Sequence, residues 1–154
     1  MSQALIEDFY AAFGRGDGDA MAACYAPGAR FDDPVFKKLR GEEPGAMWRM
    51  LTAEARELAV ELLDYADHGE WGTARWRARY VFPETDRPVV NEVFAAFRFA
   101  DGRIAEHADS FSFHSWAWQA LGVRARVPGT LKVVRAAVRR RARKHLHAFM
   151  AGGG

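Results

Sequence analysis

The chain has 154 residues, of which 49% are hydrophobic, and its formal net charge is +2. This length supports one well-buried core and is too short for two ordinary domains. No apolar stretch approaches the roughly 18–20 residues needed to cross a bilayer, and the N-terminal residues lack the basic and long apolar regions of a secretory signal. Cys24 is the only cysteine, which excludes an internal disulfide and leads us to expect a cytoplasmic protein.

The first part of the chain is predicted to be mainly helical. Apolar residues at helical spacing predict a helix over residues 3–14, which a glycine cluster ends. Asp17 or Asp19 can cap a second short helix that runs to about Tyr25. Residues 29–32 follow as a short strand. Residues 41–52 then form a third predicted helix.

From residue 58 the pattern becomes typical of strands. Four strands are predicted over residues 58–66, 73–82, 88–100 and 103–113, and Asp101-Gly102 between the last two is a strong hairpin signal. An antiparallel meander preceded by helices indicates an α+β domain, with the helices covering one face of the sheet.

Charge is distributed unevenly, and this sets the last part of the chain apart. Residues 1–109 hold 13 basic and all 20 acidic residues, a net charge of −7, whereas residues 110–154 hold nine basic residues and no acid. Two helices are predicted there, over residues 116–121 and 131–150, with Pro128-Gly129 between them. We therefore treat residues 1–122 as the domain and residues 123–154 as a basic amphipathic helical extension of it.

The second of these helices carries an apolar stripe opposite its basic face. We expect the stripe to dock on the body of the domain or on a second subunit. Attachment to a membrane surface is the alternative for a basic amphipathic helix. Nucleic-acid binding is not expected, because aromatic residues are not interleaved with the charges and no known motif is present.

Several short motifs carry a resemblance to a known superfamily. They are Phe9-Tyr10-Ala11-Ala12-Phe13, Gly16-Asp17, Tyr25-Ala26-Pro27, Phe31-Asp32-Asp33-Pro34, Gly41, Phe97-Arg98-Phe99 and Asp101-Gly102-Arg103-Ile104. Together they resemble the nuclear transport factor 2-like (NTF2-like) superfamily, which includes ketosteroid isomerase, SnoaL-like polyketide cyclases, limonene epoxide hydrolase and scytalone dehydratase. The resemblance implies a cone-shaped, cystatin-like α+β fold with N-terminal helices packed on a curved antiparallel sheet. That scaffold hosts many chemistries and also pure binding roles.

More narrowly, three further stretches look like a bacterial SnoaL-like group. They are Val35-Phe36 through Gly41, Met47-Trp48, and Trp116 through Gly122.

Asp33 is the first candidate for a catalytic side chain. Pro34 forces the backbone before it out of helix, and burial in an apolar cavity would raise the pKa of a carboxyl group there. The resemblance places the base of ketosteroid isomerase at Asp33. It places the two oxyanion-hole donors of that enzyme at Phe9 and Ala95, whose side chains cannot donate a hydrogen bond. Loss of one such donor typically costs roughly 100- to 1,000-fold in rate, so steroid isomerisation by that mechanism is not expected. Asp33 could instead simply cap the following turn.

The final predicted strand supplies the other candidates. Residues at alternate positions share one face, and the resemblance turns this face toward a cavity. The residues predicted to form the site are Asp33, His107 and Asp109 for proton transfer, and Phe9, Met47, Trp48, Trp76, Tyr80, Asn91, Phe97 and Phe111 for the ligand pocket. An apolar hollow with a few polar groups is typical of a small-molecule site. His107 beside Asp109 could form an acid–base pair, as in SnoaL-like cyclases, or could be a structural residue with its own partner.

We therefore predict a protein that binds a small, largely apolar molecule. If it is an enzyme, it would be a cofactor-free isomerase, cyclase, dehydratase or epoxide hydrolase. The alternative is a non-enzymatic ligand-binding or interaction module. No metal site is expected, because His107 and Asp109 lack a third ligand at diagnostic spacing, and no phosphate loop or dinucleotide motif appears.

A homodimer is predicted through the outer face of the sheet. Arg75, Arg77 and Arg79 alternate along one predicted strand and would lie on that face. They could meet acids such as Glu61 or Glu92.

Overall fold

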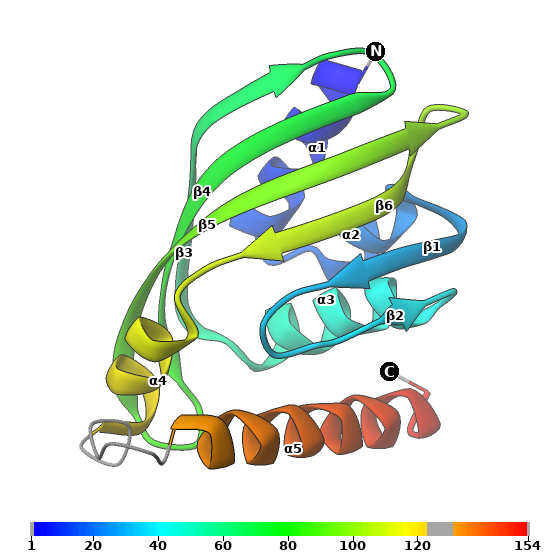
Figure 1. Cartoon of the computed structure of the whole chain (residues 1–154). Coiled ribbons are helices and arrows are strands. Elements are labelled where there is room, and N and C mark those ends of the chain that lie inside the picture. The colour runs from blue at the N-terminus through cyan, green and yellow to red at the C-terminus, as the bar shows by residue number, and fades with distance from the viewer. Residues whose placement is uncertain (1, 123–130, 154) are drawn as a thin grey trace.

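The structure, a computed structural model, describes residues 2–122 and 131–153 (Figure 1). The elements in chain order are α1 (Ser2–Gly14), α2 (Gly18–Ala23), β1 (Tyr25–Asp32), β2 (Leu39–Arg40), α3 (Glu43–Glu54), β3 (Arg56–Asp67), β4 (Trp71–Phe82), β5 (Arg87–Ala100), β6 (Arg103–Ser110), α4 (Phe113–Leu121) and α5 (Leu131–Ala151). The predicted α+β class is confirmed, and the predicted elements occur in the predicted order. The short strand β2 was not predicted, and β1 begins at Tyr25 rather than at the predicted residue 29. Pro128-Gly129, predicted to separate the last two helices, lies outside the described residues.

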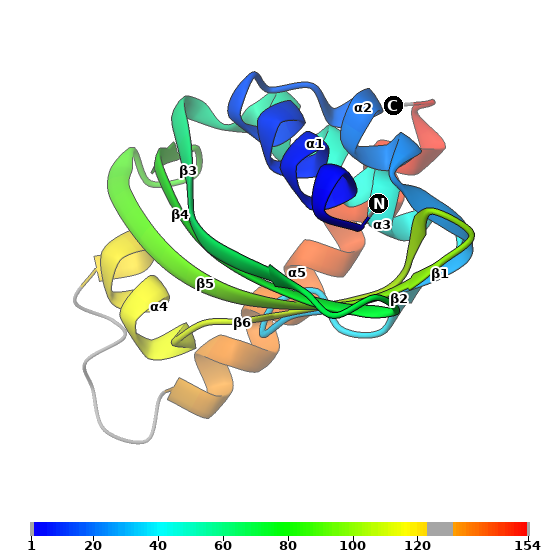
Figure 2. The same ribbon diagram turned by 90° about the horizontal axis from the view of Figure 1, so that it is seen from above.

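The six strands form one open sheet in the order β2-β1-β6-β5-β4-β3. The pairs from β3 to β6 are antiparallel, as the meander predicts, and β1 pairs parallel to β6. Register shifts interrupt β3 against β4 at two places, and such bulges increase the local twist and bend of a sheet. Figure 2 shows the resulting curved sheet with α1 and α2 on its concave side.

Local signals explain where several elements begin and end. The Asp17 side chain caps α2 by accepting a hydrogen bond from the Ala20 N–H at 3.0 Å. Asp101 and Gly102 both have positive φ, which is the geometry of a two-residue hairpin turn. The last strand ends at Ser110 rather than at the predicted residue 113, because Ser112 caps α4 through the Ser115 N–H.

The main core fills the space between α1, α3 and the concave face of the sheet. Phe9, Met47 and Phe97 lie at its centre and are fully buried. A second, smaller cluster around Phe113 and Trp116 joins α4 to the start of β5. No helix in residues 2–122 or 131–153 is long and apolar enough to cross a membrane.

The helix α5 lies along the end of the domain that carries α4 and α3 (Figure 1). Leu146 is its fully buried side chain and belongs to the main core, with Phe149 and Met150 packed against the same core. Toward its N-terminus, Leu131, Val134 and Val138 pack against the smaller cluster. The predicted apolar stripe therefore docks on the body of the same chain.

Candidate functional site

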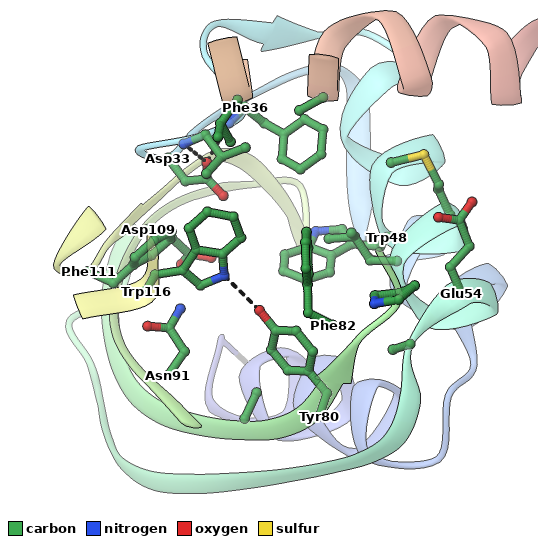
Figure 3. Close-up of a pocket in the computed structure, with 18 of the residues that line it drawn as sticks. Asp33, Phe36, Trp48, Glu54, Tyr80, Phe82, Asn91, Asp109, Phe111 and Trp116 are labelled. Atoms are coloured by element: carbon green, nitrogen blue, oxygen red, sulfur yellow. Dashed lines mark hydrogen bonds between the residues drawn. The ribbon is translucent and has the colours of Figure 1, made fainter. Parts of the chain in front are cut away.

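A cavity of about 250 Å³ lies between the sheet, α3, α4 and α5 (Figure 3). Its aromatic lining consists of Phe13, Phe36, Trp48, Trp76, Tyr80, Phe82, Phe111 and Trp116. The polar side chains in its wall are Asp33, Glu54, Glu84, Asn91, Asp109, Arg141 and His145. An apolar hollow with a few polar groups is the usual composition of a small-molecule site.

The structure brings most of the predicted site residues to this cavity. Asp33, Trp48, Trp76, Tyr80, Asn91, Asp109 and Phe111 line it. The other four, Phe9, Met47, Phe97 and His107, do not line it and lie in the core behind it. They share the concave side with the lining residues, but the rings of Phe9, Phe97 and His107 pack against one another and leave no open space there.

A tight turn after β1 fixes the position of Asp33. Its Oδ1 accepts hydrogen bonds from the N–H groups of Val35 at 2.7 Å and Phe36 at 2.6 Å. Its own N–H donates to the Phe36 carbonyl at 2.9 Å. Asp33 therefore does cap the turn, but only through one oxygen, and Figure 3 shows the other oxygen pointing into the cavity.

The pKa of Asp33 is raised from 3.8 to about 7. The largest cause is burial, and the nearby Asp109 and Asp32 carboxylates add to it, while the N–H groups of Phe36 and Val35 act in the opposite direction. Asp33 is partly buried, and the part of its surface that remains accessible faces the cavity. A carboxyl group with this pKa can both take up and release a proton near neutral pH.

Stability should fall as the pH rises, because of Asp33. Between about pH 4 and 7 the folded protein keeps this carboxyl protonated while the unfolded chain has lost the proton. We therefore expect the free energy of unfolding to decrease across this window by on the order of 3 kcal/mol. Denaturant unfolding of wild type and Asp33→Asn at several pH values measures it, because the amide of the variant does not titrate. Parallel pH profiles for the two proteins would contradict the raised pKa.

Asp109 is held by a buried chain of hydrogen bonds. The Trp48 Nε1–H donates to the Tyr25 hydroxyl at 2.7 Å, this hydroxyl lies 2.7 Å from His107 Nδ1, and His107 Nε2 lies 2.8 Å from Asp109 Oδ1. Because indole can only donate, one consistent assignment has Tyr25 donating to Nδ1 and the Nε2–H donating to the carboxylate. A neutral imidazole thus satisfies every member of the chain.

Two further groups offer hydrogen bonds toward the cavity. The Tyr80 hydroxyl accepts from the Trp116 Nε1–H at 2.9 Å (Figure 3), and burial raises the pKa of Tyr80. The Tyr80 hydroxyl proton has no acceptor among the described residues and can donate a hydrogen bond to a ligand in the cavity. The Asn91 amide also lines the cavity without a hydrogen-bond partner in the described part of the chain.

The part of the cavity wall that α5 supplies was not predicted from the sequence. Val138, Arg141, Ala142 and His145 line the cavity, although the stripe that contains Val138 and Ala142 was recognised as a docking surface. Its spacing shows that one helix face is buried, but not which part of the domain that face meets.

Comparison with known proteins settles the family. The SnoaL-like domain family matches residues 6–107. The chain belongs to this family. No curated protein matches this SnoaL-like chain significantly.

Solved structures confirm the predicted cone-shaped NTF2-like fold. A ketosteroid isomerase-like protein from Catenulispora acidiphila, in complex with trimethylamine, is 16% identical with a TM-score of 0.68, and the match covers 80% of this chain and 95% of that chain. An NTF2-like protein of unknown function from Burkholderia pseudomallei is 17% identical with a TM-score of 0.66, covering 77% and 95%. IdmH, a putative polyketide cyclase from Streptomyces antibioticus, is 25% identical with a TM-score of 0.63, covering 79% and 98%.

A metal site was not expected from the sequence. Among residues 2–122 and 131–153, no group of three or more His, Cys, Asp or Glu side chains is placed to hold a metal ion.

Proposed function

We propose that this SnoaL-like protein catalyses proton transfer on a small, largely apolar carbonyl compound without a cofactor. The observation that carries the proposal is the Asp33 carboxyl, which opens onto an apolar cavity and has a pKa of about 7. The likeness to IdmH supports a reaction of this class, because that protein is described as a putative polyketide cyclase.

The roles of the side chains follow from their positions. Asp33 takes a proton from the carbon next to the carbonyl group, and the electron pair of the broken C–H bond moves onto the carbonyl oxygen. The Tyr80 hydroxyl and the Asn91 amide are the groups that can donate hydrogen bonds to this oxygen. The protonated Asp33 then returns this proton to another atom of the product or loses it to water. Asp109, held by the His107 ring, is the second carboxyl group in the cavity wall and can accept a hydrogen bond from the substrate.

Isomerisation, aldol-type cyclisation and loss of water can each begin with this proton removal. One assay therefore tests the shared step: deuterium uptake from D₂O by α-tetralone, a two-ring ketone with exchangeable protons beside its carbonyl, followed by mass spectrometry. We expect the protein to accelerate uptake above the buffer rate. If the ketone binds and its uptake is not accelerated, the cavity serves binding alone, which is the alternative function.

We also propose that the protein forms a homodimer through the outer face of the sheet. Phe94 is 50% exposed and Val90 is 40% exposed on this face. They lie opposite Arg75 and Arg79 of the neighbouring strand β4. Arg77, between them, already pairs with Glu61 and Glu92 of its own chain, so the contact would centre on the apolar residues. Sedimentation should show a dimer that Phe94→Asp dissociates, and a wild-type monomer at micromolar concentration would contradict the proposal.

A further inference from the structure

One face of α5 forms a wall of the cavity. Arg141 and Ala142 follow Val138 by three and four residues, and His145 follows them by four and three, so all four lie on the same side of the helix. The two small apolar side chains bound the hollow directly. This wall lies outside the part of the chain that the SnoaL-like family matches, which ends at residue 107.

Two side chains of this α5 face, Arg141 and His145, contact two different parts of the cavity rim. Arg141 Nε lies 3.4 Å from Glu84 in the turn between β4 and β5. His145 Nε2 lies 2.8 and 2.9 Å from the two carboxylate oxygens of Glu54 at the end of α3. The side chains of both pairs are 39–74% exposed, and exposed polar pairs of this kind contribute little to holding a helix in place.

Both ends of α5 pack on apolar clusters of the domain. Toward the N-terminus of the helix, Leu131 and Val134 pack against the smaller cluster. Its C-terminal part inserts the fully buried Leu146 into the main core. Its middle is tied to the turn after Asp33, because the Arg139 Nε donates to the Pro34 carbonyl at 2.9 Å and Arg143 donates to the Lys37 carbonyl at 3.0 Å. Apolar contacts therefore anchor α5 on both sides of the cavity, and exposed polar pairs hold it to the cavity rim between these anchors.

We propose that α5 is the gate of the cavity and that Val138 and Ala142 set the size of molecule it admits. The cavity volume of about 250 Å³ falls below the roughly 300–1,000 Å³ of pockets that take drug-sized ligands. The site therefore admits uncharged molecules of about two fused rings and excludes four-ring ones. This inference rests on the proposed function only in assuming that the cavity is the substrate site.

Binding of two ketones tests the size limit. Calorimetry should show that the full-length protein binds α-tetralone at least about tenfold more tightly than progesterone, which has four rings. Ala142→Trp should weaken binding of α-tetralone by at least about tenfold because the indole fills the hollow. Ala136→Trp is the matched control, since Ala136 is exposed on α5 and does not line the cavity.

A kinetic measurement tests the gate itself and does not depend on the folding of Ala142→Trp. Trp48, Trp76 and Trp116 line the cavity and report ligand exchange by fluorescence. Arg141→Gln should speed dissociation of α-tetralone by about two- to fivefold, within the range of one exposed ion pair. Arg140→Gln, which removes an exposed neighbouring charge away from the cavity, should leave the rate unchanged.

An unchanged dissociation rate of α-tetralone in Arg141→Gln would overturn the gate. Equal affinity for the two ketones, unchanged α-tetralone binding in a folded Ala142→Trp protein, or binding of neither ketone would overturn the size limit. Selective binding of α-tetralone without deuterium uptake would instead contradict the proposed function and leave the gate standing.

Discussion

Asp33→Asn should slow deuterium uptake by α-tetralone by about 100- to 10,000-fold, the usual contribution of a positioned acid or base. The amide cannot take up the proton, but its oxygen can still accept the hydrogen bonds from the Val35 and Phe36 N–H groups that shape the turn. The variant should therefore fold normally and still bind the ketone. Deuterium uptake followed by mass spectrometry, alongside calorimetric binding, separates the loss of chemistry from a loss of affinity.

The neighbouring carboxylate provides a matched control. Asp32 does not line the cavity and instead binds the Lys37 ammonium at 2.7 Å and the Lys38 N–H at 2.9 Å. Asp32→Asn should keep most of the wild-type rate. Equal rates for Asp33→Asn and Asp32→Asn would refute the role of Asp33.

The wild-type rate of deuterium uptake should also rise with pH and reach half its maximum at about pH 7, because Asp33 acts as a base only when ionised.

Tyr25→Phe should lower the free energy of unfolding by about 2–4 kcal/mol. The hydroxyl lies between the Trp48 indole and the His107 ring, all three buried. Its removal leaves one donor and one ring nitrogen without a partner, and each unsatisfied buried polar group costs about 1–3 kcal/mol. Guanidinium unfolding monitored by fluorescence measures the change.

Tyr65→Phe is the same substitution in an exposed setting. The Tyr65 hydroxyl donates to Glu7 at an exposed site, where water replaces the lost partner. We expect a change within about 0.5 kcal/mol. If Tyr25→Phe lowered the free energy of unfolding by no more than Tyr65→Phe does, the buried chain of hydrogen bonds that orients Asp109 would not stabilise the protein.

The fold could be predicted because its signals are local. Helical spacing located α1, the Asp101-Gly102 turn located the last hairpin, and the Asp-Asp-Pro junction located the end of β1. Strand alternation put His107 and Asp109 on one face of the sheet, and the family resemblance turned that face toward the cavity.

Which residues of the concave face line the cavity, and which lie in the packed core, could not be predicted in the same way. Phe97 pairs directly with His107 across two strands, and both lie against Phe9 of α1, so this part of the face is packed solid. Alternation tells which side of a sheet a residue faces and not whether a helix covers it. For the same reason, the cavity wall that α5 supplies follows from tertiary packing, which the spacing of its apolar residues does not encode.

The central claim is that Asp33 is a buried acid that titrates near neutral pH. Carbon-13 NMR of the side-chain carboxyl groups, with the Asp33 signal assigned by its loss in Asp33→Asn, measures this directly. The account predicts a titration midpoint at about pH 7. A midpoint near the ordinary aspartate value of about 3.9 would contradict it, because such a carboxyl would be solvated and a poor base for the proposed chemistry.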